Sequence, residues 1–165
     1  LTPSTGTINS HARIGMVFQN PDHQILMPNC RSELLININQ KISTKELARR
    51  VNNVLDKVGL TGFEKRPVYT LSGGQKQRLM IACALISNKN LILLDEPTAL
   101  LDRNSQLQVI KTIKRLTLDK INPLTALWIT HRHEELNYAD EVAEMKNGTI
   151  SDWQKPSKFK YNSKL

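Results

Sequence analysis

Two adjacent carboxylates follow a short apolar run near the middle of this 165-residue chain. Asp95 and Glu96 come directly after residues 91–94, and such a run suits a strand buried on both faces of a parallel sheet. Ligands of open α/β sheets bind beyond the carboxyl ends of the strands. An aspartate there can hold Mg²⁺, usually through water, and a glutamate can polarise an attacking water. A plain strand followed by an acidic turn remains the alternative for this motif alone.

A glycine pair upstream marks a second candidate binding site. Ser72, Gly73 and Gly74 precede a segment dense enough in apolar residues to predict a largely buried helix. Ser72 is a good N-cap, and the glycines let the backbone approach a ligand without a Cβ in the way. A helix N-terminus attracts anions through its free N–H groups and its dipole. Phosphate binding is therefore predicted, with an ordinary capped helix as the alternative.

Five segments follow one another in the chain at residues 17–21, 71–75, 91–96, 99–102 and 128–131. Taken together and in this order, they resemble the motifs of the ATP-binding cassette (ABC) family, the nucleotide-binding domains of ABC transporters. The resemblance implies an α/β fold, a P-loop NTPase-like core with a helical subdomain at about residues 25–85. Residues 18–24 most resemble importers of the cobalt and energy-coupling-factor type. The motifs are similar to the family's Q-loop (residues 17–21), signature loop (residues 71–75), Walker B strand (91–96), D-loop (99–102) and switch-histidine strand (128–131).

The resemblance implies ATP and Mg²⁺ as ligands, because the family sandwiches two ATP molecules between two cassettes. Asp95 would support Mg²⁺, and Glu96 would be the general base. His131 would contact the γ-phosphate, and Gln19 would sense Mg²⁺ and the γ-phosphate. Without the other motifs, His131 could also be interpreted as a structural or surface histidine, and Gln19 as an ordinary loop amide.

Other residues would act across the dimer. In the family, the signature loop contacts the γ-phosphate held by the other subunit, and the D-loop crosses the seam. The resemblance therefore implies that the nucleotide of the other subunit is bound in trans by Ser72, Gly73, Gly74 and Gln75. It also implies that Asp102 lies at the dimer interface.

The phosphate-binding P-loop is absent from the sequence. None of the seven glycines precedes a Lys-Ser or Lys-Thr pair, so no G-x-x-x-x-G-K-[ST] loop is present. We therefore expect an N-terminally truncated ABC core that lacks a segment of roughly 40–60 residues, judged against ordinary α/β domain size. A truncated gene model, a fragment or a split gene would each give this pattern. Without the P-loop amides and lysine, the chain alone is expected neither to bind ATP tightly nor to hydrolyse it.

Composition favours one domain without a nucleic-acid partner. The net charge is +8, but the basic residues are dispersed and only 5% of residues are aromatic. The densest basic excess lies in residues 151–165, interpreted as a solvated, partly disordered tail. The longest apolar run, residues 79–86, is far short of the roughly 20 residues of a membrane span. Cys30 and Cys83 are isolated thiols, which fits a reducing cytoplasm.

Local patterns predict the elements that position these motifs. Strands are predicted at residues 14–18 and 126–130, and a helix follows Asp102. A capping box at residues 43–46 should begin a helix that ends before Gly59 in the C′ position. Residues 141–150 read as a hairpin, with its turn at Asn147 and Gly148.

The leading hypothesis is the ATP-hydrolysing subunit of an ABC transporter, peripheral at the cytoplasmic face of the membrane. Its partners would be a second ABC ATPase subunit, identical or not, and transmembrane permease subunits, with import favoured over export. A soluble, non-transporter ABC ATPase is less favoured, because such proteins tend to carry coiled-coil inserts or tandem cassettes. A third hypothesis is a non-catalytic partner that donates its signature loop in trans. Glu96 and His131 argue against it, since such a partner would not need both.

Overall fold

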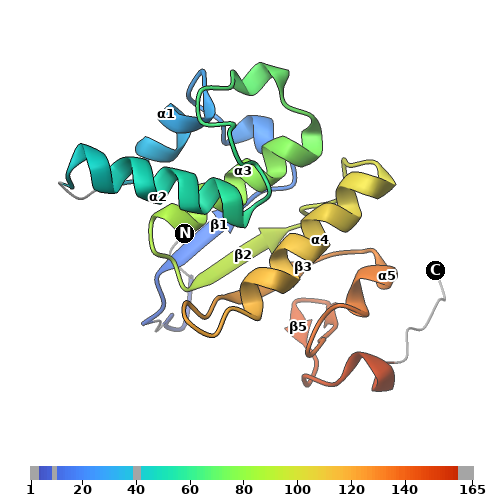
Figure 1. The fold of residues 1–165 in the computed structure, drawn as a ribbon. Helices are drawn as coiled ribbons and strands as arrows, with labels where there is room; N and C mark the ends of the chain where they lie inside the picture. The colour runs from blue at the N-terminus through green and yellow to red at the C-terminus, as the bar shows by residue number, and fades with distance from the viewer. Residues whose placement is uncertain (1–3, 9–10, 39–41, 160–165) are drawn as a thin grey trace. The chain divides into compact units, whose positions relative to one another are not determined.

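The computed structural model describes residues 4–8, 11–38 and 42–159. The chain divides into two compact units, Leu1–Ile129 and Thr130–Leu165 (Figure 1). The first unit contains the three-stranded sheet and the long helices, and the described elements of the second unit are short.

A three-stranded parallel sheet organises the first unit. Its strands are β1 (Ile14–Val17), β2 (Leu91–Asp95) and β3 (Thr125–Ile129), in the order β1-β2-β3. Val17 pairs with Leu94, and Asp95 pairs with Ile129. The carboxyl ends of all three strands therefore lie at one edge of the sheet. The strands predicted from the sequence are confirmed, with ends that differ by at most one residue.

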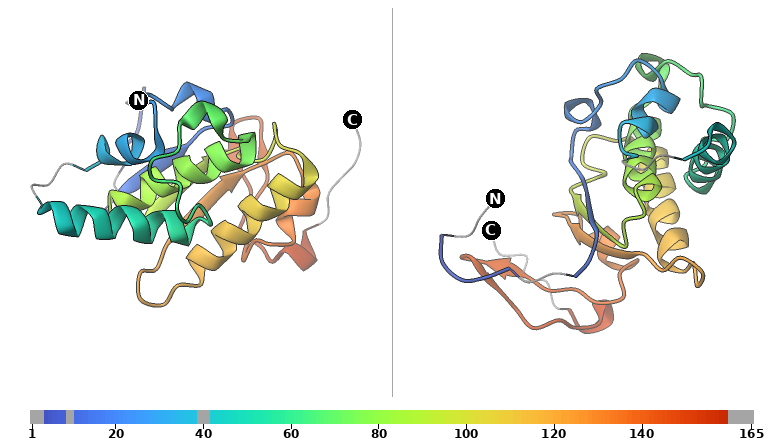
Figure 2. Two further views of the ribbon diagram at one scale, coloured as in Figure 1. Left: turned by 45° about the horizontal axis from the view of Figure 1, so that its top comes forward. Right: turned by 90° about the vertical axis from the view of Figure 1, so that its left-hand side faces the viewer.

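The described residues of the first unit also form the α-helices α1 (Cys30–Leu35), α2 (Thr44–Lys57), α3 (Gly73–Ile86) and α4 (Arg103–Thr117). Two 3-10 turns, η1 (Pro21–His23) and η2 (Val68–Thr70), lie between them. Helices α1 and α2 each pack on α3, α3 also packs on β1, and α4 packs on α3 and β3 (Figures 1 and 2). The predicted helical region at about residues 25–85 thus corresponds to α1, α2 and α3, whereas its treatment as a separate subdomain stays a prediction.

The helices cover one face of the sheet. Ile92 and Leu94 on β2 are buried, whereas Leu91 and Leu93 on the opposite face are only partly buried. The expectation that this strand is buried on both faces is therefore wrong for the described residues. The same uncovered face bears apolar side chains that are 40–58% exposed, namely Ile14, Met16, Leu127 and Ile129.

The start of α2 differs in one respect from the predicted capping box. Ser43 accepts a hydrogen bond from the backbone N–H of Glu46, as expected (3.2 Å). The Glu46 carboxylate does not reach back to Ser43 but pairs with Arg49 at 2.7 Å and Arg50 at 2.9 Å. These hydrogen bonds lower the pKa of Glu46 to about 2. At the other end, Gly59 has φ +68° and follows the C-cap Val58, so the predicted C′ glycine is confirmed.

The second unit contains α5 (His133–Leu136), the hairpin strands β4 (Met145–Lys146) and β5 (Thr149–Ile150), and the 3-10 turn η3 (Pro156–Lys158). The predicted turn is confirmed, because Asn147 and Gly148 both have positive φ, 51° and 76°. Gln154 exchanges two backbone hydrogen bonds with Val142. The described part of the predicted basic tail is therefore folded, and Lys160 and Lys164 lie outside the described residues.

Both cysteines are buried and free, and burial raises the pKa of each thiol. This fits the predicted structural role of Cys83 in a buried helix. Among the described helices, none has the length and apolar character needed to cross a membrane.

Candidate functional site

The carboxyl edge of the sheet brings together three of the predicted site residues. Asp95 is the last residue of β2, and Glu96 follows it. Because Val17 pairs with Leu94 in parallel register, Gln19 leaves β1 beside the point where Glu96 leaves β2. The Glu96 N–H donates to the Ile129 carbonyl (3.0 Å), which extends the pairing of β2 and β3 by one residue. Gln19, Asp95 and Glu96 therefore share one edge, where ligands of parallel sheets bind.

Glu96 adopts an unusual backbone conformation. Its φ is +42°, in the left-handed region that non-glycine residues enter rarely and often at functional positions. The conformation is held on both sides, by the Ile129 carbonyl and by the Ala99 N–H, which donates to the Glu96 carbonyl (3.1 Å). The backbone thus turns sharply at Glu96, so its side chain leaves the strand in a direction different from that of Asp95.

The signature loop ends in a complete capping box. The Ser72 hydroxyl accepts from the Gln75 N–H (3.3 Å), and the Gln75 side-chain oxygen accepts from the Ser72 N–H (3.0 Å). The prediction that Ser72 caps this helix is confirmed. The local role of Gln75 was not predicted, although a serine followed three residues later by glutamine is the pattern of a capping box.

The glycines of the signature loop have a packing role inside this chain. A Cβ on Gly74 would lie 2.7 Å from the Ser105 Cβ and Oγ on α4. A Cβ on Gly73 would lie 3.2 Å from the Leu101 side chain. The close approach of α3 to α4 therefore needs glycine at residue 74, whatever ligand the loop contacts.

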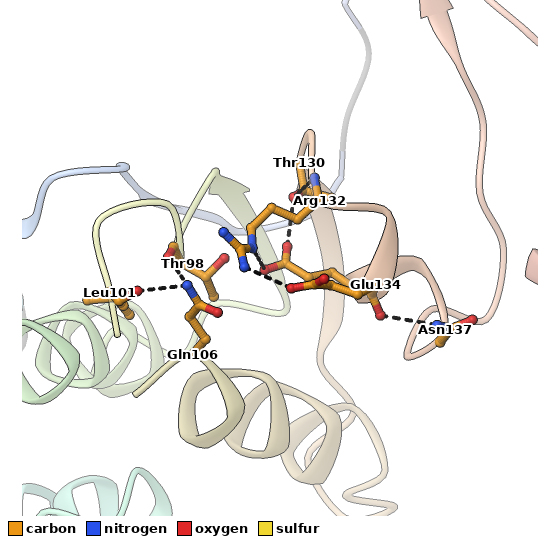
Figure 3. A network of polar contacts seen from close by, with 8 residues as sticks. Thr98, Leu101, Gln106, Thr130, Arg132, Glu134 and Asn137 are labelled. Atoms are coloured by element: carbon orange, nitrogen blue, oxygen red, sulfur yellow. Dashed lines mark hydrogen bonds and ion pairs between the residues drawn. The ribbon is translucent and has the colours of Figure 1, made fainter. Parts of the chain in front are cut away.

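Asp102 begins α4 beside the signature loop. Its carboxylate accepts from the Ser105 N–H (3.0 Å), so it is the N-cap of α4. Hydrogen bonds from the Ser105 side chain and backbone lower the pKa of Asp102. The buried Gln106 holds the preceding loop, since its side-chain amide donates to the carbonyls of Leu101 (2.7 Å) and Thr98 (3.4 Å) (Figure 3). Gln106 was not predicted, because nothing in its local sequence distinguishes it from an exposed helix glutamine.

His131 belongs to the second unit, two residues after the end of β3. Around it, the Thr130 hydroxyl donates to the carboxylate of the buried Glu135 (2.7 Å) and accepts from the Arg132 N–H (3.0 Å). The Arg132 guanidinium pairs with Glu134 (2.8 Å) (Figure 3). His131 thus lies in a short segment whose neighbours on both sides are fixed by side-chain hydrogen bonds.

A divalent cation would have few protein ligands here. No group of three or more His, Cys, Asp or Glu side chains suited to a metal occurs in the part of the chain that the structure describes. The Asp95 carboxylate and the Gln19 amide offer oxygen donors at one edge of the sheet. A small number of protein oxygen donors suits Mg²⁺, because this ion keeps several water ligands and binds together with substrate phosphates.

Comparisons with known proteins point to one family. Residues 2–99 match the family model described as ABC transporter. The chain is 41% identical to ABC transporter I family member 10 of Arabidopsis thaliana, over 98% of this chain and 64% of that protein. It is 38% identical to the energy-coupling factor transporter ATP-binding protein EcfA1 of Streptococcus pyogenes, over 89% of this chain and 52% of that protein. The chain thus spans about half to two thirds of the length of these relatives.

Solved structures show the same fold. The cbiO1 protein of Clostridium perfringens, part of the ABC transporter complex cbiONQ, superimposes with a TM-score of 0.79 at 32% identity, over 87% of this chain and 57% of that one. A dimeric ATP-binding cassette in a post-hydrolysis state, bound to ADP and phosphate, gives a TM-score of 0.69 at 26% identity, over 90% of this chain and 65% of that one. The family match, the relatives and the shared α/β core together show that this chain belongs to the ABC transporter family.

Proposed function

We propose that this chain is the core of an ATP-binding and ATP-hydrolysing subunit that powers an ABC importer. The observation that carries the proposal is the carboxyl edge of the sheet, where Gln19, Asp95 and Glu96 lie on neighbouring strand ends. Phosphoryl transfer depends mainly on positioning and on charge stabilisation, and strands of a rigid sheet supply such positioning.

Each residue of this edge has a chemical role in the proposal. Mg²⁺, when bound with ATP, would neutralise charge on the phosphates, and Asp95 would hold it with Gln19 nearby. Glu96 would accept a proton from the attacking water. His131 would contact the γ-phosphate, and Gln19 would report its presence to a membrane subunit.

The completed site needs parts that these 165 residues do not contain. A G-x-x-x-x-G-K-[ST] loop would supply the amides and the lysine that hold the β- and γ-phosphates. The uncovered apolar face of the sheet supports this proposal, because such a face is stable when another layer packs on it. The signature loop, with Ser72, Gly73, Gly74 and Gln75, would act on the ATP of a second subunit, and Asp102 would lie near the seam between the two.

The proposed membrane partner rests on the relatives, and the proposed import rests on the resemblance of residues 18–24 to the Q-loop of importers. EcfA1 is by its name an ATP-binding protein of an energy-coupling factor transporter, and cbiO1 is part of a transporter complex. We therefore propose that transmembrane permease subunits bind this chain at the cytoplasmic face of a membrane.

ATP binding and phosphate release test the proposed function. We expect the 165-residue chain alone to show neither tight binding nor turnover, because most of the triphosphate-binding groups are absent. After joining or mixing with a segment that carries the phosphate loop, both should appear. Turnover by the chain alone that is lost on Glu96→Gln would contradict the need for that loop. A folded chain without activity in either form would favour the non-catalytic partner instead.

A further inference from the structure

Three consecutive side chains at the start of α3 reach three different segments of the first unit. The Lys76 ammonium pairs with the Asp22 carboxylate of η1 at 2.7 Å. The Gln77 amide donates to the Phe18 carbonyl at 2.9 Å. The Arg78 guanidinium donates to the Val58 carbonyl at the end of α2 at 3.1 Å. These contacts span between 20 and 59 positions of sequence, so they are tertiary links rather than features of the helix itself.

Both backbone polar groups of Phe18 are hydrogen-bonded by side chains. Its carbonyl accepts from Gln77, and its N–H donates to the Gln24 side-chain oxygen at 2.8 Å. The Gln24 amide in turn donates to the Met16 carbonyl at 3.1 Å. Phe18 directly precedes Gln19, so these contacts fix the backbone from which the Gln19 side chain extends.

Gln77 is a polar residue in a buried position. The residue is fully buried, and its side-chain oxygen has no hydrogen-bond partner among the described residues. A buried polar atom without a partner destabilises a fold, and an apolar side chain of similar size would avoid that cost. What an apolar side chain would lose is the hydrogen bond to Phe18, which points to a positioning role.

We propose that Gln77 and Lys76 are positioning residues that hold the Q-loop on the helix whose first turn is the signature loop. Gln77 fixes the residue before Gln19, and the ion pair between Lys76 and Asp22 fixes the turn after it. Displacement of the signature loop would then displace Gln19. The functional meaning rests on the proposed function, in which the signature loop meets one subunit's ATP and Gln19 senses the other's.

Hydrogen exchange of the full chain tests the link without nucleotide. Ser72→Ala removes the N-cap of α3. Because loss of a typical N-cap destabilises a helix by about the free energy of a fivefold change in an equilibrium, amide exchange in the linked Q-loop should rise about fivefold. In a chain that also carries Gln77→Leu and Lys76→Met, Ser72→Ala should change Q-loop exchange less than about twofold. Gln108→Leu on the exposed side of α4, and Lys57→Met in the ion pair with Asp119, are the matched controls.

The proposal is overturned if Ser72→Ala raises amide exchange in the Q-loop by the same factor whether or not Gln77 and Lys76 are present. It is also overturned if Gln77→Leu raises Q-loop exchange no more than the two controls do. Should the double variant not fold, Asp22→Asn tests the ion-pair link by itself: the Asp22 side chain is 60% exposed, and in this variant Ser72→Ala should also change Q-loop exchange less than in the wild-type chain.

A kinetic measurement then distinguishes positioning from stability. In the completed enzyme, Gln77→Leu should lower kcat about tenfold and leave the KM for ATP within about twofold, because misplacement of a contact made at the reacting phosphate affects turnover. If no variant or wild-type enzyme turns over ATP, the proposed function fails, while the exchange result still decides the link between the two loops.

Discussion

Glu96→Gln in the completed subunit should abolish ATP hydrolysis while ATP remains bound. Glutamine preserves the size of the side chain but cannot accept a proton, so the loss expected for a general base is about 10²–10⁴-fold in kcat. Binding should change by less than about threefold, because the phosphates are held mainly by the loop amides, the lysine and Mg²⁺. The backbone supports this expectation, since Glu96 is fixed in a left-handed conformation by hydrogen bonds that the substitution does not touch.

Rapid mixing with measured phosphate release gives the kcat of this variant. Glu141→Gln is the matched control, because Glu141 is exposed and is not one of the predicted site residues. The assignment of Glu96 as the general base would be wrong if both variants retained wild-type turnover.

Gly74→Ala should destabilise the chain by about 1–3 kcal/mol, the usual cost of forcing an extra carbon into a packed interior. The new Cβ would lie 2.7 Å from the Ser105 side chain, so α3 and α4 must separate. Urea unfolding of the full chain measures the loss. The same separation would move the signature loop away from Leu101 and Asp102, so turnover of the completed enzyme should fall with stability.

Ser105→Gly tests the cause of this effect. It removes the atoms that the new Cβ meets, so the double variant should be clearly more stable than the sum of the two single changes predicts. Gly62→Ala is the control, because Gly62 also resists substitution, through φ +80°, but has no atom within 4 Å of an added Cβ. Simple additivity of Gly74→Ala and Ser105→Gly would show that contact with Ser105 is not the cause.

Local patterns predicted the elements of this fold well. The strands at residues 14–18 and 91–94, the helix that ends before Gly59 and the turn at Asn147 all depend on near neighbours in sequence. The order of the motifs predicted the family, which the comparisons confirm. One local prediction that formed only in part is the capping box at Ser43, since Arg49 and Arg50 compete for the Glu46 carboxylate.

Contacts between distant segments could not be predicted in the same way. Gly74 meets Ser105 across 31 positions, and Gln77 meets Phe18 across 59. Neither pair has a spacing that local periodicity reveals, because each arises only when α3 packs on α4 or on the end of β1. The glycines of the signature loop were therefore predicted to serve a ligand, whereas the structure adds a packing role within the chain.

The central claim is a composite ATPase site, in which Glu96 and the signature loop of one chain serve different ATP molecules. The most direct test is ATP turnover in a mixture of two completed, individually inactive variants, Glu96→Gln and Ser72→Asp. Aspartate keeps the N-cap of α3 but places a negative charge where the loop would meet phosphate. In a mixed dimer, the intact Glu96 of one chain and the intact signature loop of the other form one complete site, so we predict recovered turnover. As a control, Glu96→Gln is mixed with a chain that carries both changes, and we predict no turnover. If the first mixture stays as inactive as the second, Glu96 and Ser72 do not act in the proposed composite arrangement.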